Sequence, residues 1–366
     1  MIDFRMPCNW DSKLLDAVAG SPVTSFFGMV PSHVAGGGRP TAAVPKIDPA
    51  GARAYIQAVR AKGYSFNYLF NAPCLDAKEF TATWREEFVR HLDWAVESGA
   101  DWATVTVPYL IEVIKKRHPA LKVSVSSYAR VNSLRRAVYF QELGADDITL
   151  DPISMTRNFR GLEAMTKTLR CSVTLIANGD CLYQCPFAEY HAVLMGHSSQ
   201  DNHASGGYYE EYPFYNCSVR KLRDPAEIVR SGFIRPEDLG LYAEVGVTHF
   251  KLVDRGRPTA WLASVLKAYA QGRYDGDLLQ ILNFPHFFLG WVYQQAGNKD
   301  RPLFPTVDNR ALDGFIETLR KIDCVNRDCD SCGVCREYAG RAVKKPEGVA
   351  KMVAALDSTL AKLQFT

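Results

Sequence analysis

Short apolar runs alternate with amphipathic stretches along most of the chain. The runs are rich in β-branched and aromatic residues and predict eight strands, at residues 2–7, 23–30, 64–70, 102–107, 122–127, 147–151, 173–179 and 249–254. Stretches with helical periodicity follow them, for example at 86–99 and 133–145. Eight such units within about 255 residues favour an α/β fold of the (β/α)8 TIM-barrel type over an open doubly wound sheet, which seldom needs eight strands.

Two segments break the alternation. Residues 180–235 are too long for a single loop and helix, so we expect a cysteine-containing insertion after the seventh strand. Beyond the eighth strand, residues 276–366 are rich first in aromatic residues and then in cysteines, which predicts a C-terminal extension. The chain is therefore expected to form a barrel over residues 1–275, with the insertion inside it, followed by the extension.

The composition is that of an ordinary globular protein. Hydrophobic residues make up 47% of the 366 residues, charged residues make up 23%, and the formal net charge is +3. This small excess of positive charge gives little reason to expect a nucleic-acid partner. No apolar run approaches the roughly 20 residues that span a bilayer, and the first residues lack the pattern of a signal peptide. We therefore expect a cytoplasmic protein without a membrane partner.

Ten cysteines in a reducing compartment indicate metal binding or catalysis rather than disulfides. Four of them form a C-x4-C-x2-C-x2-C quartet near the end of the chain: Cys324, Cys329, Cys332 and Cys335. Four thiolates at such short spacing can complete a tetrahedral zinc site or hold an iron–sulfur cluster. The spacing permits both, and we favour the cluster.

A second group of cysteines lies in the insertion. Cys181 and Cys185 are spaced C-x3-C directly after the seventh predicted strand, and Cys217 is the candidate for a third metal ligand. The fourth ligand stays open, with Cys74, Cys8 and Cys324 as candidates. A catalytic thiol activated by a histidine is the competing hypothesis, but a lone nucleophile does not explain so many clustered cysteines.

Polar residues gather where predicted strands end, and that face of a barrel carries the active site. Its arginines and lysine suit a carboxylate or phosphate, so we expect an anionic small-molecule substrate, for which an aromatic acid is one candidate. The glycines at 36–38 would allow the backbone to approach such a ligand closely. We predict His191, Arg235, Lys251 and Asp254 as catalytic residues, and Arg39, Asn71, Tyr128, Arg157 and Arg255 as substrate-binding residues.

The segment NGDCLYQCPFAEYH at 178–191, the run from 234 to 255 and the cysteine-rich tail together resemble the collagenase-like peptidase family, U32. The likeness covers roughly residues 1–340. It implies similarity to iron–sulfur proteins that add hydroxyl groups without molecular oxygen, to ubiquinone precursors or RNA bases, with prephenate as the oxygen donor. In those proteins, cysteines on a barrel-like domain hold a [4Fe–4S] cluster, and Cys181, Cys185 and Cys217 match them. The chain lacks the closely spaced glycine–cysteine signature of the long peptidase-type members, which favours a small-molecule substrate.

These observations predict an iron–sulfur enzyme, an oxygen-independent hydroxylase or a related redox enzyme, with one or two [4Fe–4S] clusters. Zinc at the tail quartet is the alternative for that site. A peptidase-type hydrolase is the alternative function, although we find neither a Ser–His–Asp order nor the H-E-x-x-H pattern of zinc proteases. A noncatalytic iron–sulfur scaffold is the third hypothesis, and a homologous or redox protein is then a candidate partner.

Overall fold

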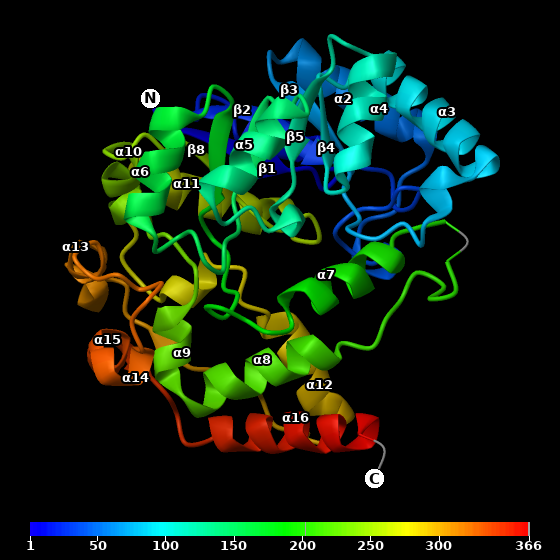
Figure 1. The fold of residues 1–366 in the computed structure, drawn as a ribbon. Helices are drawn as coiled ribbons and strands as arrows, with labels where there is room; N and C mark the ends of the chain where they lie inside the picture. Colours follow the sequence, from blue (N-terminus) through cyan, green and yellow to red (C-terminus); the bar gives the residue numbers. More distant parts are fainter. Residues whose placement is uncertain (202, 365–366) are drawn as a thin grey trace.

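Eight parallel strands close into a barrel in the order of the sequence (Figure 1), in a computed structural model that describes residues 1–201 and 203–364. The strands are β1 (Asp3–Pro7), β2 (Val23–Gly28), β3 (Ser65–Phe70), β4 (Trp102–Val105), β5 (Lys122–Val125), β6 (Asp147–Thr149), β7 (Ser172–Ile176) and β8 (His249–Lys251). All eight predicted strands are present, and the (β/α)8 fold is confirmed.

Several strands end earlier than the apolar runs predicted, and β7 shows why. The ladder between β7 and β8 ends at the pair Ile176 and Lys251. Beyond it the side chain of Asn178 replaces the backbone ladder, donating to the Val253 carbonyl at 2.6 Å and accepting from the Val253 N–H at 2.8 Å. The apolar run therefore continues as a loop that a side chain holds in place.

Helices surround the barrel between consecutive strands. They are α1 (Lys13–Ala17), α2 (Pro49–Ala61), α3 (Ala82–Ser98), α4 (Pro108–Arg117), α5 (Leu134–Glu142), α6 (Phe159–Thr168), α10 (Leu239–Ala243) and α11 (Thr259–Gln271). The third helix shows how the sequence sets the bounds. The Thr81 side chain accepts from the Trp84 N–H at its start, and Gly99 ends it with a φ of 109°, which favours glycine.

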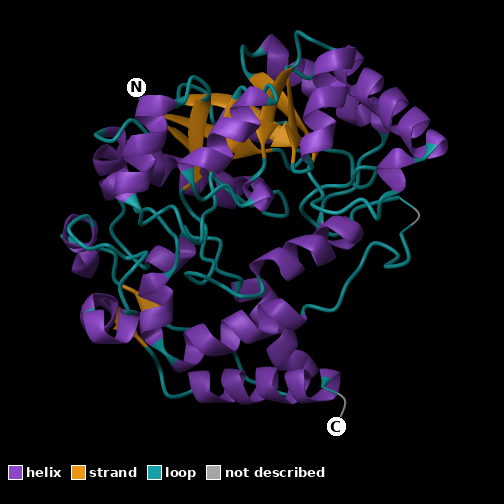
Figure 2. Ribbon diagram, viewed as in Figure 1, coloured by secondary structure: helices purple, strands orange, loops and turns teal. Residues whose placement is uncertain are grey.

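The insertion and the tail together form a second, helical layer. The insertion contains α7 (Ala188–His197), α8 (Tyr212–Arg223) and α9 (Pro225–Arg230), and the tail contains α12 (His286–Gln295), α13 (Phe315–Leu319), α14 (Cys329–Cys332), α15 (Val334–Ala342), α16 (Val349–Leu363), β9 (Thr306–Val307) and β10 (Val343–Lys344). Helix α8 packs against α16, and α9 packs against α15. Figures 1 and 2 show this layer on one side of the barrel, with α7 between the barrel and α8.

The barrel interior carries a buried polar group among apolar side chains. Asp147 is fully buried and accepts from Arg5 at 2.6 Å, Ser124 at 2.6 Å and Thr174 at 2.8 Å. Arg5 on β1 thus pairs with Asp147 on β6 through the barrel interior. The buried carboxylate is stabilised because both of its oxygens accept hydrogen bonds.

A depression of about 810 Å³ opens at the amino-terminal end of the barrel, where Asp3, Arg117 and Lys122 line it. That end of a barrel ordinarily supports stability rather than chemistry. Within 1–201 and 203–364, no helix combines the length and apolar character needed to cross a membrane.

Candidate active site and cysteine groups

A cluster of charged and polar side chains, the cationic cluster, forms at the carboxyl end of the barrel, where the loops after β2, β5 and β8 meet. The Arg39 Nε donates to Asp254 Oδ2 at 2.8 Å, and its Nη1 donates to the Gly38 carbonyl at 2.8 Å and reaches the Tyr128 hydroxyl at 3.4 Å. A Cβ on Gly38 would stand 2.8 Å from the Tyr128 ring, so only glycine allows this approach. The structure thus brings together Arg39, Tyr128 and Asp254, three of the residues predicted from strand ends.

Arg255 and His191 lie near Arg39 and complete the cationic cluster. Burial, together with the nearby charge of Arg39, lowers the pKa of Arg255 to about 10. The Arg255 side chain makes no hydrogen bond or ion pair with any residue that the structure describes, so its donors are available to a ligand. Burial and the charge of Arg39 also lower the pKa of His191 to about 4, and its Nε2 lies 2.9 Å from the Tyr209 hydroxyl. The cationic cluster therefore combines two guanidinium groups with a neutral imidazole.

Lys251 lies deeper, inside the barrel at the end of β8. Its Nζ stands 4.2 Å from the centroid of the Phe27 ring. Burial lowers the pKa of Lys251 to about 7, and the charge of Arg5 acts in the same direction. An amine with this pKa can give or take a proton near neutral pH.

We expect Lys251→Met to change how stability depends on pH. The folded pKa of about 7 lies below the ordinary value of 10.5, so between these values the unfolded chain holds a proton that the folded chain has lost. The free energy of unfolding of the wild type should therefore rise with pH between about 7 and 10.5, by at most about 1.4 kcal/mol per pH unit. At and below about pH 7 the wild type carries the full free-energy cost of burying this lysine. The stability advantage of the variant should be largest near pH 7 and shrink toward pH 10, measured by urea unfolding.

The matched control for this change is Lys116→Met, which removes an exposed lysine from α4. Its unfolding free energy should follow that of the wild type at every pH. If the unfolding free energies of Lys251→Met and of the wild type changed with pH in parallel, the lowered pKa of Lys251 would be contradicted.

Two predicted site residues, Arg235 and Arg157, lie away from the cationic cluster. Arg235 is buried, binds Asp238 through two hydrogen bonds of 2.8 and 2.9 Å, and donates to the Asn309 carbonyl at 2.8 Å. Arg157 donates to the Ser231 carbonyl at 2.8 Å and lines the pocket of the tail cysteines. Both arginines join the barrel side of the molecule to the tail, which the sequence did not predict.

Asn71 lies at the end of β3 near the mouth. Its amide donates to Ser126 Oγ at 3.2 Å. Its Oδ1 is buried without a hydrogen-bond partner among the described residues. A buried, unpaired acceptor is costly, so this atom is suited to receive a hydrogen bond from a ligand.

The insertion contains three cysteines, Cys181, Cys185 and Cys217 (the barrel cysteines). Cys217 on α8 lies within electrostatic reach of Cys181 and Cys185, and of Lys221 and Asp180. Burial raises the pKa of Cys217 to about 12, although Lys221 acts against this. Lys221 Nζ pairs with Asp180 Oδ2 at 2.8 Å. A cation held beside three thiols would stabilise their thiolate forms when they bind a metal.

The four tail cysteines line one pocket. Its walls are Arg157, Tyr183, Arg230, Leu319, Ile322, Cys324, Arg327, Cys329, Cys332 and Cys335. Burial and the neighbouring tail cysteines raise the pKa of Cys324 to about 11. Three arginines around four thiols provide positive charge that would offset bound thiolates. The structure thus places Cys324 in the same pocket as Cys329, Cys332 and Cys335.

Tyr183 lies between the two cysteine groups. It stands between Cys181 and Cys185 in sequence, and its hydroxyl donates to the Cys324 carbonyl at 2.8 Å. Neither this contact nor the position of Lys221 beside the cysteines was predicted from the sequence. The lysine could have been found, since it follows Cys217 by four residues and therefore shares a face of the same helix.

The other two candidates for a fourth ligand lie elsewhere. Cys8 is buried beneath the mouth, and burial raises its pKa to about 12. Cys74, after β3, lies beside Asp76 and His197, and its carbonyl accepts from Gln200 at 2.8 Å. Neither cysteine is among the groups that shift the pKa of Cys217.

Comparisons with known proteins agree with the fold and identify relatives. No family model matches the chain. The uncharacterized protease MJ1657 of Methanocaldococcus jannaschii is 30% identical over 283 residues, which cover 76% of this chain and 77% of the relative. The solved structure of the U32 peptidase Mk0906 superposes with a TM-score of 0.52 at 20% identity, over 69% of this chain and 93% of that one. On this sequence and structural similarity, the chain belongs to the U32 peptidase family.

Proposed function

We propose that the protein is an iron–sulfur enzyme that hydroxylates an anionic small molecule without molecular oxygen. The observation that carries this proposal is the position of the barrel cysteines relative to the cationic cluster. Tyr128, which contacts Arg39 in that cluster, lies within electrostatic reach of Cys181. A ligand held by the arginines of this cluster would therefore share the electrostatic environment of Cys181.

The donor set suits a cluster better than a single ion. Two thiolates that share one tetrahedral zinc stand about 3.8 Å apart, because each Zn–S bond is about 2.3 Å. In the part of the chain that the structure describes, no three sulfurs of either cysteine group lie within 4.8 Å of one another. Sulfur atoms that lie further apart than the ligands of one zinc ion suit a cluster, because each iron atom of a cluster takes one thiolate. Three barrel thiols would leave one iron position for substrate, and the tail quartet would hold a second cluster.

The reaction must balance without oxygen gas. A hydroxylated organic acid would supply the oxygen atom: its C–O bond breaks, the C–O bond of the product forms, and the hydrogen of the acceptor moves to the donor. The acceptor carbon is oxidised by two electrons and the donor carbon is reduced by two. A bound cluster would supply a Lewis-acidic iron and a route for electrons.

Residues of the cationic cluster, and Asn71 near it, have separate roles in this proposal. Arg255 binds the substrate carboxylate, since its donors are free, and Asp254 fixes the orientation of Arg39. His191 stays neutral at physiological pH and can accept a proton from the acceptor or the donor. Asn71 accepts a hydrogen bond from a hydroxyl group of the ligand.

Anaerobic purification tests the proposal. We expect a coloured protein with acid-labile sulfide and an EPR signal after reduction. With a hydroxylated acid whose hydroxyl carries an oxygen isotope, mass spectrometry should detect the label in a hydroxylated aromatic acceptor. A colourless, iron-free protein after anaerobic reconstitution would contradict the cluster. Iron without transfer of label to any acceptor would favour a scaffold function.

A peptidase is the second candidate, because both compared proteins are named as a protease or peptidase. Its test is cleavage of a peptide library by protein purified in air and stripped of iron. Cleavage that survives iron removal would favour the hydrolase and contradict the redox proposal.

A further inference from the structure

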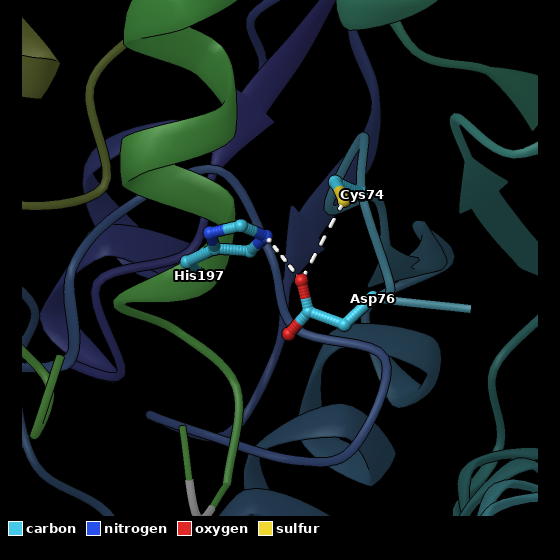
Figure 3. A group of neighbouring side chains, drawn as sticks. All are labelled: Cys74, Asp76 and His197. Atoms are coloured by element: carbon cyan, nitrogen blue, oxygen red, sulfur yellow. Dashed lines mark hydrogen bonds and ion pairs between the residues drawn. The ribbon is translucent and has the colours of Figure 1, made fainter. Parts of the chain in front are cut away.

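A separate group of potential metal ligands lies at the far end of α7. Cys74 and Asp76 follow β3, and His197 is the last residue of α7 (Figure 3). The helix begins three residues after Cys185 and is ten residues long, so about 15 Å of helix separates its two ends. This site is therefore distinct from the barrel cysteines.

The donor atoms of this group face one another. Figure 3 shows one carboxylate oxygen of Asp76 between the thiol and the imidazole. Cys74 Sγ lies 3.8 Å from Asp76 Oδ1, and His197 Nε2 lies 3.2 Å from the same oxygen. All three donor atoms are within 4.8 Å of one another, and no other three Cys, His, Asp or Glu residues of the described chain share this property.

These distances match a tetrahedral ion. Zinc binds sulfur at about 2.3 Å and nitrogen or oxygen at about 2.0–2.2 Å, which places an N and an O ligand about 3.3 Å apart and an S and an O ligand about 3.5 Å apart. The corresponding distances at Asp76 Oδ1 are 3.2 Å to His197 Nε2 and 3.8 Å to Cys74 Sγ. Small side-chain rotations would bring all three atoms onto one ion.

His197 provides an independent indication. Its Nε2 is buried and has no hydrogen-bond partner within residues 1–201 and 203–364, although a carboxylate oxygen is only 3.2 Å away. The pair thus has the distance but not the direction of a hydrogen bond. A buried nitrogen left without a partner is costly, and a metal ion between the two groups would satisfy both.

Surrounding residues hold the carboxylate in place. Asp76 Oδ2 pairs with Lys78 Nζ at 3.1 Å and with His203 Nε2 at 3.5 Å, which leaves Oδ1 for the ion. His203 Nδ1 accepts from the Ser205 N–H at 3.1 Å, so a neutral His203 carries its proton on Nε2, facing Asp76. His203 is therefore a positioning residue that orients a ligand from outside the coordination shell.

We propose that Cys74, Asp76 and His197 bind one zinc ion and leave its fourth position to water. One thiolate, one imidazole and one carboxylate match the ligands that zinc prefers, and three protein ligands with an open position are typical of catalytic zinc sites. The ion joins the loop after β3 to the end of α7. It thereby fixes the insertion against the barrel.

Zinc content of the full chain, purified without oxygen, tests this site. The wild type should contain one more zinc per chain than Cys74→Ser or His197→Gln, by elemental mass spectrometry, whereas iron should be equal in all three. The matched controls are Cys171→Ser and His118→Gln, which remove a cysteine and a histidine far from the site and should keep the zinc. Cobalt in place of zinc should give a near-ultraviolet thiolate-to-metal band that Cys74→Ser lacks.

A second variant tests the site without removing a ligand, so that its result does not depend on how well a ligand variant folds. His203→Gln keeps all three ligands and should weaken zinc affinity about 10–100-fold, measured by competition with a chelator. Equal zinc content and equal cobalt spectra in the wild type and all variants would overturn the proposal. Loss of iron rather than zinc in Cys74→Ser would also overturn it, because Cys74 would then be the fourth ligand of the barrel cluster. Neither result depends on whether the protein hydroxylates a substrate.

Discussion

Cys181→Ser, purified without oxygen, is expected to contain about half of the wild-type iron and no hydroxylase activity, because in the proposed function each of the two cysteine groups would hold a separate cluster of about four iron atoms. Cys332→Ser should lose the other half of the iron and keep the barrel cluster. The physical reason is that each variant removes one thiolate from a different group: Cys181 lies near Cys185 and Cys217, whereas Cys332 shares the tail pocket. Iron and sulfide assays with EPR spectra of the reduced proteins provide the measurement.

Cys171→Ser is the control for both variants. Cys171 is half-buried at the start of β7, outside either cysteine group, and its replacement should leave the iron content unchanged. Complete loss of iron in both variants would contradict two independent clusters. It would instead support one cluster that takes ligands from the insertion and from the tail, with Cys324 as the shared residue.

Arg235→Leu is expected to lower the free energy of unfolding by about 3–5 kcal/mol, the usual cost of removing one partner of a buried ion pair. Arg235 and Asp238 are both 2% exposed, and the same guanidinium holds the Asn309 carbonyl of the tail. The substitution leaves the Asp238 carboxylate buried without its partner. Because most domains are stable by only about 5–15 kcal/mol, the loss should be plain in urea unfolding.

The controls separate a structural role from a catalytic one. Arg273→Ala removes an exposed arginine that pairs with Asp275 and should leave the free energy of unfolding close to that of the wild type. The double variant Arg235→Leu with Asp238→Leu should recover part of the stability, since no unpaired charge remains. Wild-type stability of Arg235→Leu combined with loss of activity would contradict this account and return Arg235 to the catalytic residues that the sequence predicted.

The candidate site could be predicted only where sequence position fixes spatial position. Arg39, Tyr128 and Asp254 were predicted because each follows a strand, and the carboxyl ends of barrel strands meet at one face. The same rule failed to place Arg157, since a strand end does not show whether a long side chain turns toward the mouth or toward a packed tail. Arg235, which was predicted from its position just before a helix, also turns toward the tail. Both arginines contact main-chain carbonyls in segments far along the chain, Ser231 and Asn309.

The pairing of insertion and tail could not be predicted either. Helices α8 and α16 pack together although more than a hundred residues separate them in the chain. Their amphipathic patterns show that each needs an apolar partner but do not identify it. The tail therefore was predicted as an extension, whereas it packs on the insertion as part of one helical layer (Figure 1).

The sequence by itself determined the barrel, because the alternation of apolar strands and amphipathic helices is a local property, and it determined which cysteines are grouped by short spacing. Only the tertiary structure decided that Cys74 faces Asp76 and His197 and that Lys221 lies beside the barrel thiols. Contacts of this kind join loops from distant parts of the chain. Their geometry depends on how the layers pack, and no local pattern of residues encodes it.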